Sequence, residues 1–525
     1  MRDGLKIAAA VGAVASLVSF GEAYAQTPQY GGTAIFTITG DPITFSSAVQ
    51  SNSPDQQLSC IIYPSLIQFD HNYQMHPWLA KSWTISPDGL TYTFELNKAE
   101  WHDGKPFTSE DAKYSIGEIS TKLSTVFRRA GEAIASIETP APDKIVFKLK
   151  QGFGPFMVSL GCIQGGAIMP AHLLRGTDPL KNPAITTTPV GTGAFKFAEQ
   201  KRDQYIRLVK NPKYFEPGKP YLDEVIAKVI PQASARTAAL QAGEVDLTRS
   251  IATNDIAAVL ANPKLKVEDD DVPPSMMPLF FNLKQKPLDN KLVRQALFMA
   301  LDRDYIVKNA FFGNGEPGTQ PFSPRIPWVK DPSIDYRKMY PFDVAKANAM
   351  LDEAGVKRGA DGKRFKLSLL PILGYPEFDQ VAVAMKSMWG AVGVDVTIEN
   401  MDTPSHLKRV SDGDFGVEIA GYSSYSDPAL GITRMWATSL ISKPFGNATT
   451  YSNPVIEDLF NKGELATSNE DRAKFYNPAQ KILADDLPVM MLRDYQAANG
   501  VNKKLHGVLG TSDGLGTWQN AWMEK

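Results

Sequence analysis

Short runs of alternating apolar and polar residues recur along the first third of the chain. In the run 90–96, three apolar side chains share one face and three polar ones share the other: Tyr92, Phe94 and Leu96 against Thr91, Thr93 and Glu95. Such alternation is typical of a strand with one buried face, and it recurs over 33–39 and 144–149. Because the turn sequence 86–89 precedes the run at 90–96, the pattern predicts a β-hairpin there.

A second pattern, in which a strand, a helix and another strand follow one another, occurs twice further along the chain. This order is typical of α/β architecture, so each half of the chain is predicted to contain an α/β unit. The segments are 225–230, 234–243 and 245–247 in the first unit, then 365–370, 377–392 and 394–398 in the second.

The length of 525 residues exceeds what one core usually holds, so two or three domains are expected. Residues 269–274, which are charged and contain prolines, separate the two units and are predicted to be a crossing between domains. The composition, with 43% hydrophobic residues, is that of a globular protein. A net charge of −2 provides no basic surface for nucleic acid or an anionic membrane.

The N-terminus has the pattern of a secretory signal peptide. Arg2 and Lys6 precede an apolar run at 7–20, and the small-residue site 23–25 follows it. We therefore expect residues 1–25 to be removed and the mature chain to begin near Gln26, in the periplasm. A membrane anchor is the alternative, but the apolar run is short for a membrane span. No cysteine stands directly after the cleavage site, so lipidation is not expected.

The chain contains two cysteines, Cys60 and Cys162. In an exported protein they can form a disulfide, but the sequence does not show whether the two sulfurs meet. Both alternatives stay open at this point. A cysteine metal site is not expected, because metal-binding cysteines usually occur as close pairs.

Motifs that would indicate catalysis or cofactor binding are incomplete. Residues 510–514 match the G-x-S-x-G elbow but no histidine follows them, and 405–408 match S-x-x-K without its partner motifs. The six histidines fall in no metal-binding spacing. The loop around 191–193 lacks the third glycine and the lysine of a phosphate loop, so a tight turn is predicted. We expect no catalytic residue, metal or cofactor, and this favours a binding protein.

Several stretches together resemble the peptide/nickel-type (family 5) solute-binding proteins of ABC importers. The hairpin segment and Trp101-His102-Asp103-Gly104 match the signature region of that family, and the resemblance extends over nearly all of the mature chain. The matching stretches are 79–83, 86–94, 101–111, 189–195, 211–215, 239–246, 293–297, 354–356 and 427–428.

The resemblance implies an α/β, two-lobed periplasmic-binding-protein fold of the class II (cluster C) type, with an extra domain inserted in the first lobe. The ligand lies between the lobes, which close about two crossings, here expected near 271–274 and 483–487. The predicted parts are a signal peptide at 1–25, lobe I at 26–70, 188–272 and 485–525, the extra domain at 71–187, and lobe II at 273–484.

The function implied is that of the periplasmic substrate-binding component of an ABC transporter. It would capture a peptide-like or sugar-like small polar solute and deliver it to the permease subunits in the inner membrane. A monomer that is not an enzyme and binds no nucleic acid is expected. A secreted hydrolase, or a periplasmic chaperone or sensor on the same scaffold, is the alternative.

Dipeptide binders of the family hold the ligand termini with an acid shortly before the Asp-Pro pair and an arginine after the strand that corresponds to 365–370. Here 421–426 contain no acid and 371–375 contain no arginine. A free dipeptide is therefore not expected, because buried charged termini need partners. A longer peptide, a sugar-like ligand or an amide fits better.

The predicted ligand pocket lies where strands end, because ligands of open α/β sheets bind beyond the carboxyl ends of the strands. Residues following the strand 33–39 on the first lobe should face residues following the strand 417–420 on the second. These candidate ligand-binding residues are Thr39, Gly40 and Asp41 on the first lobe and Tyr422, Ser423 and Tyr425 on the second.

Overall fold

The structure is a computed structural model of the chain, and it describes residues 27–50, 52–70, 74–124, 126–269, 275–372, 376–443, 446–495, 498–509 and 517–525. The expected signal peptide, the expected crossing at 271–274 and the motif at 510–514 lie outside these residues. Among the helices described, none is both long and apolar enough to cross a membrane.

The first lobe is built on a seven-stranded sheet in the order β12-β20-β11-β1-β10-β9-β8. Its core contains Phe36, Ile61 and Leu208, and α1 packs on the sheet. The strands predicted at 33–39 and 225–230 are confirmed as β1 and β10. The strands are β1 (Thr33–Ile38), β8 (Phe195–Lys201), β9 (Tyr205–Lys210), β10 (Glu224–Val229), β11 (Leu247–Thr248), β12 (Leu265–Asp269) and β20 (Ala498–Asn502); the helices are α1 (Ser53–Ile62), α6 (Ala171–Leu174), α7 (Pro183–Thr186), α8 (Ala233–Ala242) and α9 (Ile256–Ala261), and β21 (Leu505–His506) and β22 (Trp522–Met523) form a small ribbon.

The second lobe has its own seven-stranded sheet, β14-β19-β13-β17-β15-β16, with β18 also paired to β13. A separate core that includes Phe280, Trp389 and Met490 holds it together. The predicted strand–helix–strand unit is confirmed as β15, α14 and β16. The strands are β13 (Ser275–Phe281), β14 (Glu316–Pro317), β15 (Phe365–Pro371), β16 (Val394–Ile398), β17 (Val417–Ile419), β18 (Tyr422–Ser423) and β19 (Val489–Tyr495); the helices are α10 (Lys291–Met299), α11 (Arg303–Ala310), α12 (Tyr336–Met339), α13 (Val344–Glu353), α14 (Pro376–Ala391), α15 (Thr403–Asp412), α16 (Pro454–Leu465) and α17 (Asn469–Asp486).

A third sheet, β4-β5-β7-β6, forms the insert, by which we mean the described residues between 67 and 160. The predicted hairpin is confirmed: the Ser86 N–H donates to the Thr91 carbonyl at 2.9 Å, and Gly89 closes the turn with a φ of 68°. The insert contains β2 (Ile67–Phe69), β3 (Met75–Pro77), β4 (Ala80–Ile85), β5 (Thr91–Leu96), β6 (Ile134–Ala141), β7 (Lys144–Leu149), α2 (Ser109–Tyr114), α3 (Thr121–Leu123), α4 (Arg128–Ala133) and α5 (Phe156–Ser159).

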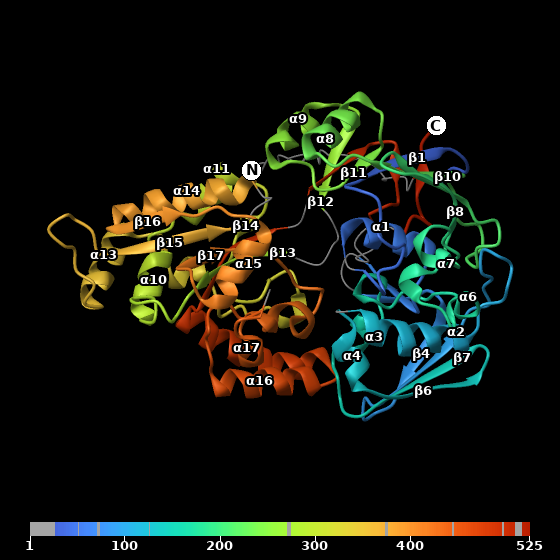
Figure 1. The fold of residues 1–525 in the computed structure, drawn as a ribbon, viewed down its shortest axis with the longest axis horizontal. Coiled ribbons are helices and arrows are strands. Elements are labelled where there is room, and N and C mark those ends of the chain that lie inside the picture. The colour runs from blue at the N-terminus through green and yellow to red at the C-terminus, as the bar shows by residue number, and fades with distance from the viewer. Residues whose placement is uncertain are drawn as a thin grey trace, which may run out of the picture.

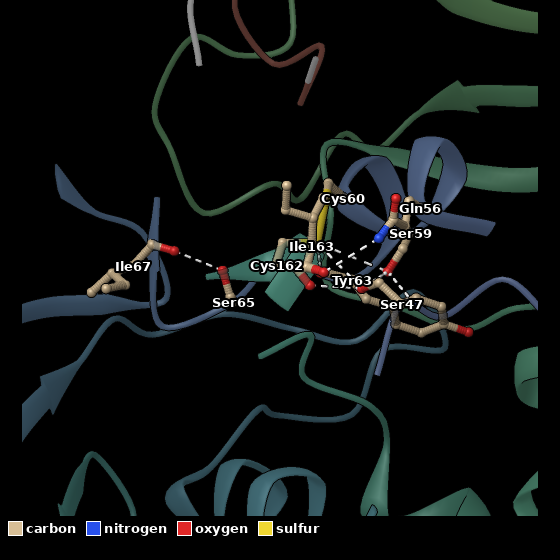
Figure 2. Close-up of a disulfide and its surroundings, with 9 residues drawn as sticks. All are labelled: Ser47, Gln56, Ser59, Cys60, Tyr63, Ser65, Ile67, Cys162 and Ile163. Carbon is tan, nitrogen blue, oxygen red and sulfur yellow. Dashed lines mark hydrogen bonds between the residues drawn. A yellow bond between two sulfur atoms is a disulfide. The ribbon is translucent and has the colours of Figure 1, made fainter. Parts of the chain in front are cut away.

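The two cysteines form a disulfide, which answers the question that the sequence left open. Cys60 in α1 is joined to Cys162, with 5.9 Å between their Cα atoms (Figure 2). The Ser47 hydroxyl donates to the Cys162 carbonyl at 2.7 Å beside the bridge. Because Cys162 belongs to the first-lobe core, the bridge fixes the segment that follows the insert to the first lobe.

The chain changes from one sheet to the other at two neighbouring places. The first change comes between Asp269 in β12 and Ser275 in β13. The second change comes between Tyr495 in β19 and Ala498 in β20. The sequence predicted this crossing near 483–487, and that position is wrong. Residues of β19 pair with β13 inside the second lobe, so the predicted start of the returning segment at 485 is also wrong. A pairing between strands about 200 residues apart leaves no local pattern in the sequence.

Candidate ligand site between the lobes

Both sheets turn the carboxyl ends of their parallel strands toward the crossings. In the first sheet, β1 and β12 run in the same direction, and the chain leaves β12 for the second lobe. In the second sheet, β13 starts at the crossing, and β15, β16 and β17 run opposite to it. Their carboxyl ends therefore return to the crossing edge. Figure 1 shows the lobes side by side with β12 and β13 on their inner sides.

Three of the predicted site residues, Thr39, Gly40 and Asp41, directly follow β1 at this edge. Thr39 is exposed, while Gly40 and Asp41 are half-buried. One carboxylate oxygen of Asp41 accepts from the Asp203 N–H at 3.0 Å. Its other oxygen is buried and has no hydrogen-bond partner within the described part of the chain, so it keeps an unused acceptor.

On the second lobe, Tyr422 and Ser423 form β18, next to the start of β13. They pair with Met276 and Ser275, the first described residues after the crossing. Tyr422 is 4% exposed, and its ring packs on Phe280 with 5.2 Å between ring centroids. Burial also raises the pKa of its hydroxyl. Tyr422 therefore belongs mainly to the core of the second lobe, although the sequence predicted it in the pocket.

The loop that follows, which we call the 424–427 loop, contains two consecutive residues in the left-handed region. Tyr425 has a φ of 47° and Ser426 a φ of 62°. Residues other than glycine adopt this backbone conformation at an energetic cost, and residues strained in this way cluster at functional sites. The hydroxyls of Ser423 and Ser424 accept from the N–H groups of Tyr425 and Ser426, both at 3.3 Å, so these serines help to hold the loop.

Sequence reasoning missed Arg434, which the turns of 428–435 bring back to this loop. Its guanidinium carbon lies 4.7 Å from the Tyr422 ring centroid and 5.7 Å from that of Tyr425. Its Nε donates to the Gly431 carbonyl at 3.0 Å. Among the described residues, the hydrogen bond recorded for its side chain is the one to this carbonyl, and no ion pair with a carboxylate is found. A half-buried arginine with unused donors can bind an anionic group in bidentate fashion.

The acid of the Asp-Pro pair has a structural role. Both carboxylate oxygens of Asp427 contact the guanidinium of Arg472, at 2.5 and 2.7 Å, and both residues are 1% exposed. The same carboxylate accepts from the Ala429 N–H at 2.9 Å. Asp427 is therefore already neutralised and is not available to a charged amine of a ligand.

A partly open cavity of about 430 Å³, which we call the interlobe cavity, lies between the insert and the second lobe. Met75, Tyr92 and Met157 line it from the insert. Trp328, Ser426 and Ser468 line it from the second lobe. Because Ser426 follows Tyr425 directly, the 424–427 loop lies between the strand ends and this cavity.

The insert and the second lobe also touch beside the cavity. Arg129 in α4 forms an ion pair with Glu464 in α16, and it donates to the Ala429 carbonyl at 3.3 Å. The Gly154 N–H donates to the Glu464 carbonyl at 2.7 Å. Figure 1 shows α4 next to α16, on the side of the molecule away from the crossings. The lobes are thus joined at two separate places.

Residues 405–408, which match a catalytic motif only in part, have ordinary structural roles. The Ser405 hydroxyl donates to Asp402 at the start of α15, and Lys408 pairs with Asp412 on the same helix. Within the described residues there is no group of three or more His, Cys, Asp or Glu side chains that could hold a metal.

Comparison with known proteins agrees with this geometry. The family model for bacterial extracellular solute-binding proteins, family 5 Middle, matches residues 74–443. The oligopeptide-binding protein AppA of Bacillus subtilis is 30% identical over 483 residues, covering 89% of this chain and 86% of that protein. The dipeptide-binding protein of Escherichia coli is 24% identical over 527 residues, covering 94% and 95%.

Solved structures give the same result. The structure of AppA from Bacillus subtilis in complex with a nonapeptide superposes with a TM-score of 0.76 at 28% identity, covering 95% of this chain and 100% of that one. The structure of DppA from Helicobacter pylori in complex with the peptide STSA also has a TM-score of 0.76, at 26% identity, with coverages of 95% and 99%. From the two lobes, the facing strand ends and these matches, we conclude that the chain belongs to the family 5 bacterial extracellular solute-binding proteins.

Proposed function

We propose that this chain is the substrate-binding component of an ABC importer, which captures a peptide or another small polar solute between its lobes and delivers it to the permease subunits. The observation that carries the proposal is the pair of facing strand edges, with the strained residues of the 424–427 loop at one of them. Relatives of the chain are named as peptide-binding proteins, and two solved structures of similar fold hold peptides.

The charges around the loop favour a ligand with a free carboxylate. The sequence suggested that the chain lacks the arginine of the dipeptide binders, but Arg434 lies against the rings of Tyr422 and Tyr425. Its unused donors suit a carboxylate, such as the C-terminus of a peptide. Asp41 on the first lobe has an unused acceptor for a donor group of the ligand. A sugar-like ligand would leave the charge of Arg434 without a partner.

The pattern at 1–25 supports export to the periplasm and a mature chain that begins near Gln26. N-terminal sequencing of the exported protein tests this point. The mature chain is proposed to act as a monomer, because one chain supplies both lobes of the site.

The function is tested by titrating the mature chain with short peptides as free acids and as matched C-terminal amides, using calorimetry and thermal shift. We expect the acids to bind and to raise the melting temperature. Loss of the charged contact in Arg434→Gln should weaken acid binding about 10- to 100-fold while leaving amide binding little changed. Arg337→Gln, which removes an exposed arginine on α12, is the matched control.

Turnover of these peptides would indicate the alternative, a secreted hydrolase. Equal affinity for acids and amides would contradict the role of Arg434. If none of the peptides binds, the proposal that the ligand is a peptide is wrong.

A further inference from the structure

Asp494, the last residue but one of β19, carries a buried carboxyl group that has no partner. The residue is 3% exposed. Within the described part of the chain, neither of its carboxylate oxygens accepts a hydrogen bond. Buried polar groups are almost always paired, and an unpaired one calls for a specific explanation. The two unused acceptors therefore point to a donor from outside the chain.

The carboxyl group stands at the edge of the second sheet that carries the candidate ligand site. β19 runs antiparallel to β13, which starts at the first crossing, so β19 ends at the same edge as β15 and β17. Asp494 is followed by Tyr495 and then by the second crossing. Because ligands of open α/β sheets bind beyond such strand ends, this carboxyl group is placed where a solute enters between the lobes.

The strand register puts Asp494 on the same face of the sheet as Tyr422. Met276 in β13 pairs directly with Asp494 on one side and with Tyr422 on the other. Directly opposed residues of antiparallel strands point their side chains to the same side. Arg434 lies against the Tyr422 ring, 4.7 Å from its centroid. One face of the sheet thus carries an unpaired carboxyl group and, two strands further, an arginine with unused donors.

The surroundings of Asp494 suit a cation as its partner. Burial raises the pKa of Asp494 to about 7, and Glu316 on the neighbouring strand β14 also raises it, whereas the Ser323 hydroxyl and Arg325 lower it. Arg493, the preceding residue of the strand, points to the opposite face of the sheet. An ammonium group would supply both the charge and the donors that this carboxylate lacks.

We propose that Asp494 is the acceptor for a cationic amine of the bound solute, while Arg434 holds a carboxylate at its other end. The inference rests on the proposed function and defines the ligand class as a zwitterion, such as a short peptide with both termini free. Two strand steps place the backbones of Asp494 and Tyr422 about 10 Å apart, which matches an extended peptide of about three residues. β19 would thus supply the acid that 421–426 do not contain.

Calorimetric titration of the mature chain with trialanine and with N-acetyl-trialanine tests the proposal, because acetylation removes the ammonium group and keeps the rest of the peptide. The wild type should bind trialanine about 10- to 100-fold more tightly than the acetylated form. Asp494→Asn keeps the shape of the side chain and should remove this preference, with the affinity for N-acetyl-trialanine little changed. Glu316→Gln, at an exposed acid opposite Asp494 in β14, is the matched control and should keep the preference.

Thermal unfolding shows whether Asp494→Asn is folded. Its melting temperature should be no lower than that of the wild type, because the carboxylate has no partner to lose. A second measurement uses the wild type alone. An amine binds the charged carboxylate, so trialanine should release close to one proton at pH 6 and the acetylated form none, as measured in two buffers of different ionisation enthalpy. Burial raises the pKa of Tyr336, the nearby phenol, so that this group does not contribute.

The proposal is overturned if the wild type does not prefer the free amine, if Asp494→Asn keeps the preference, or if trialanine binds without releasing a proton. It is also overturned if Asp41→Asn removes the preference and Asp494→Asn does not, since the amine would then lie on the first lobe. In all of these cases a peptide still binds, and the proposed function stands. If neither form binds, peptide recognition itself fails, and the role of Asp494 fails with it.

Discussion

At the scale of single residues, the 424–427 loop combines backbone strain with a half-buried aromatic ring. Tyr425 has a positive φ and a half-buried ring that contacts Arg434. Its neighbour Tyr422 is buried against Phe280. Two tyrosines only three positions apart thus differ in their surroundings: Tyr422 packs in the core of the second lobe, and Tyr425 is the one that we propose to contact the ligand.

Tyr425→Ala should weaken ligand binding by about 1–3 kcal/mol, because it removes an aromatic contact surface from the site. The melting temperature of the ligand-free protein should be nearly unchanged, since the ring is only partly buried and alanine keeps the same backbone conformation. Calorimetric titration and thermal unfolding measure the two effects. Tyr305→Ala, an exposed tyrosine on α11, is the control. Unchanged affinity together with a large loss of stability would show that Tyr425 is structural.

At the scale of elements, two stretches that carried the family resemblance are in direct contact. The turn at 101–104 meets the glycine-rich stretch at 189–195: the His102 N–H donates to the Gly191 carbonyl at 2.8 Å. The glycines are required by close packing, because a Cβ on Gly191 would lie 1.8 Å from the Ile62 carbonyl oxygen and one on Gly193 would lie 2.1 Å from that of Ile61. Neither has a positive φ, so the reason is the approach to α1 and not the predicted tight turn.

The His102 ring is held neutral in this contact. The Gly191 N–H donates to Nδ1 at 3.1 Å, and Nε2 donates to the Gly193 carbonyl at 3.0 Å. Both ring nitrogens are thereby used in the neutral form. Burial disfavours the charged ring and lowers the pKa of His102 to about 4.

This shift predicts a pH dependence of stability. The unfolded chain binds a proton at His102 below about pH 6.5, whereas the folded chain does so only near pH 4. Stability should therefore fall as the pH drops from 6.5 toward 4, by up to about 3 kcal/mol from this group. Urea unfolding of the wild type at several pH values in this range should show the loss. His102→Gln should show a smaller loss, and His76→Gln, at an exposed histidine, should keep it. Equal slopes for His102→Gln and the wild type would contradict this account.

At the scale of the whole molecule, the lobes meet at the crossings and again where the insert touches the second lobe. The second contact is tight: a Cβ on Gly152 would lie 2.2 Å from the Leu465 carbonyl oxygen. Since this contact is distant from the crossings, a small rotation about them separates it. The contact beside the interlobe cavity therefore reports on whether the lobes are closed.

Ligand binding should close the lobes and reduce the radius of gyration in solution scattering, because the ligand contacts both lobes only when they meet. In Gly152→Ala the added methyl group should hold the insert away from Leu465. The ligand-free radius should then rise, and the decrease on ligand binding should be smaller. Gly390→Ala, at a position with no atom within 4 Å of the added carbon, is the matched control. Scattering curves that do not change at saturating ligand would contradict closure about the crossings.

The sequence by itself determined the local elements and the family. The strands Thr33–Ile38 and Thr91–Leu96 and the unit from β15 to β16 follow from alternation and helical spacing, because these patterns depend on neighbours a few positions apart. Only the tertiary structure decided which distant segments meet. It paired Cys60 with Cys162, and it placed β19 in the second sheet.

The candidate site shows the same division. Its position beyond strand ends could be predicted, since it depends on the direction of the strands. The partners of its charges could not: Asp427 is neutralised by Arg472, 45 positions away, and Arg434 returns to the tyrosines only through the turns of 428–435. Such contacts depend on how packed elements place their side chains in space, and no spacing along the chain records that placement.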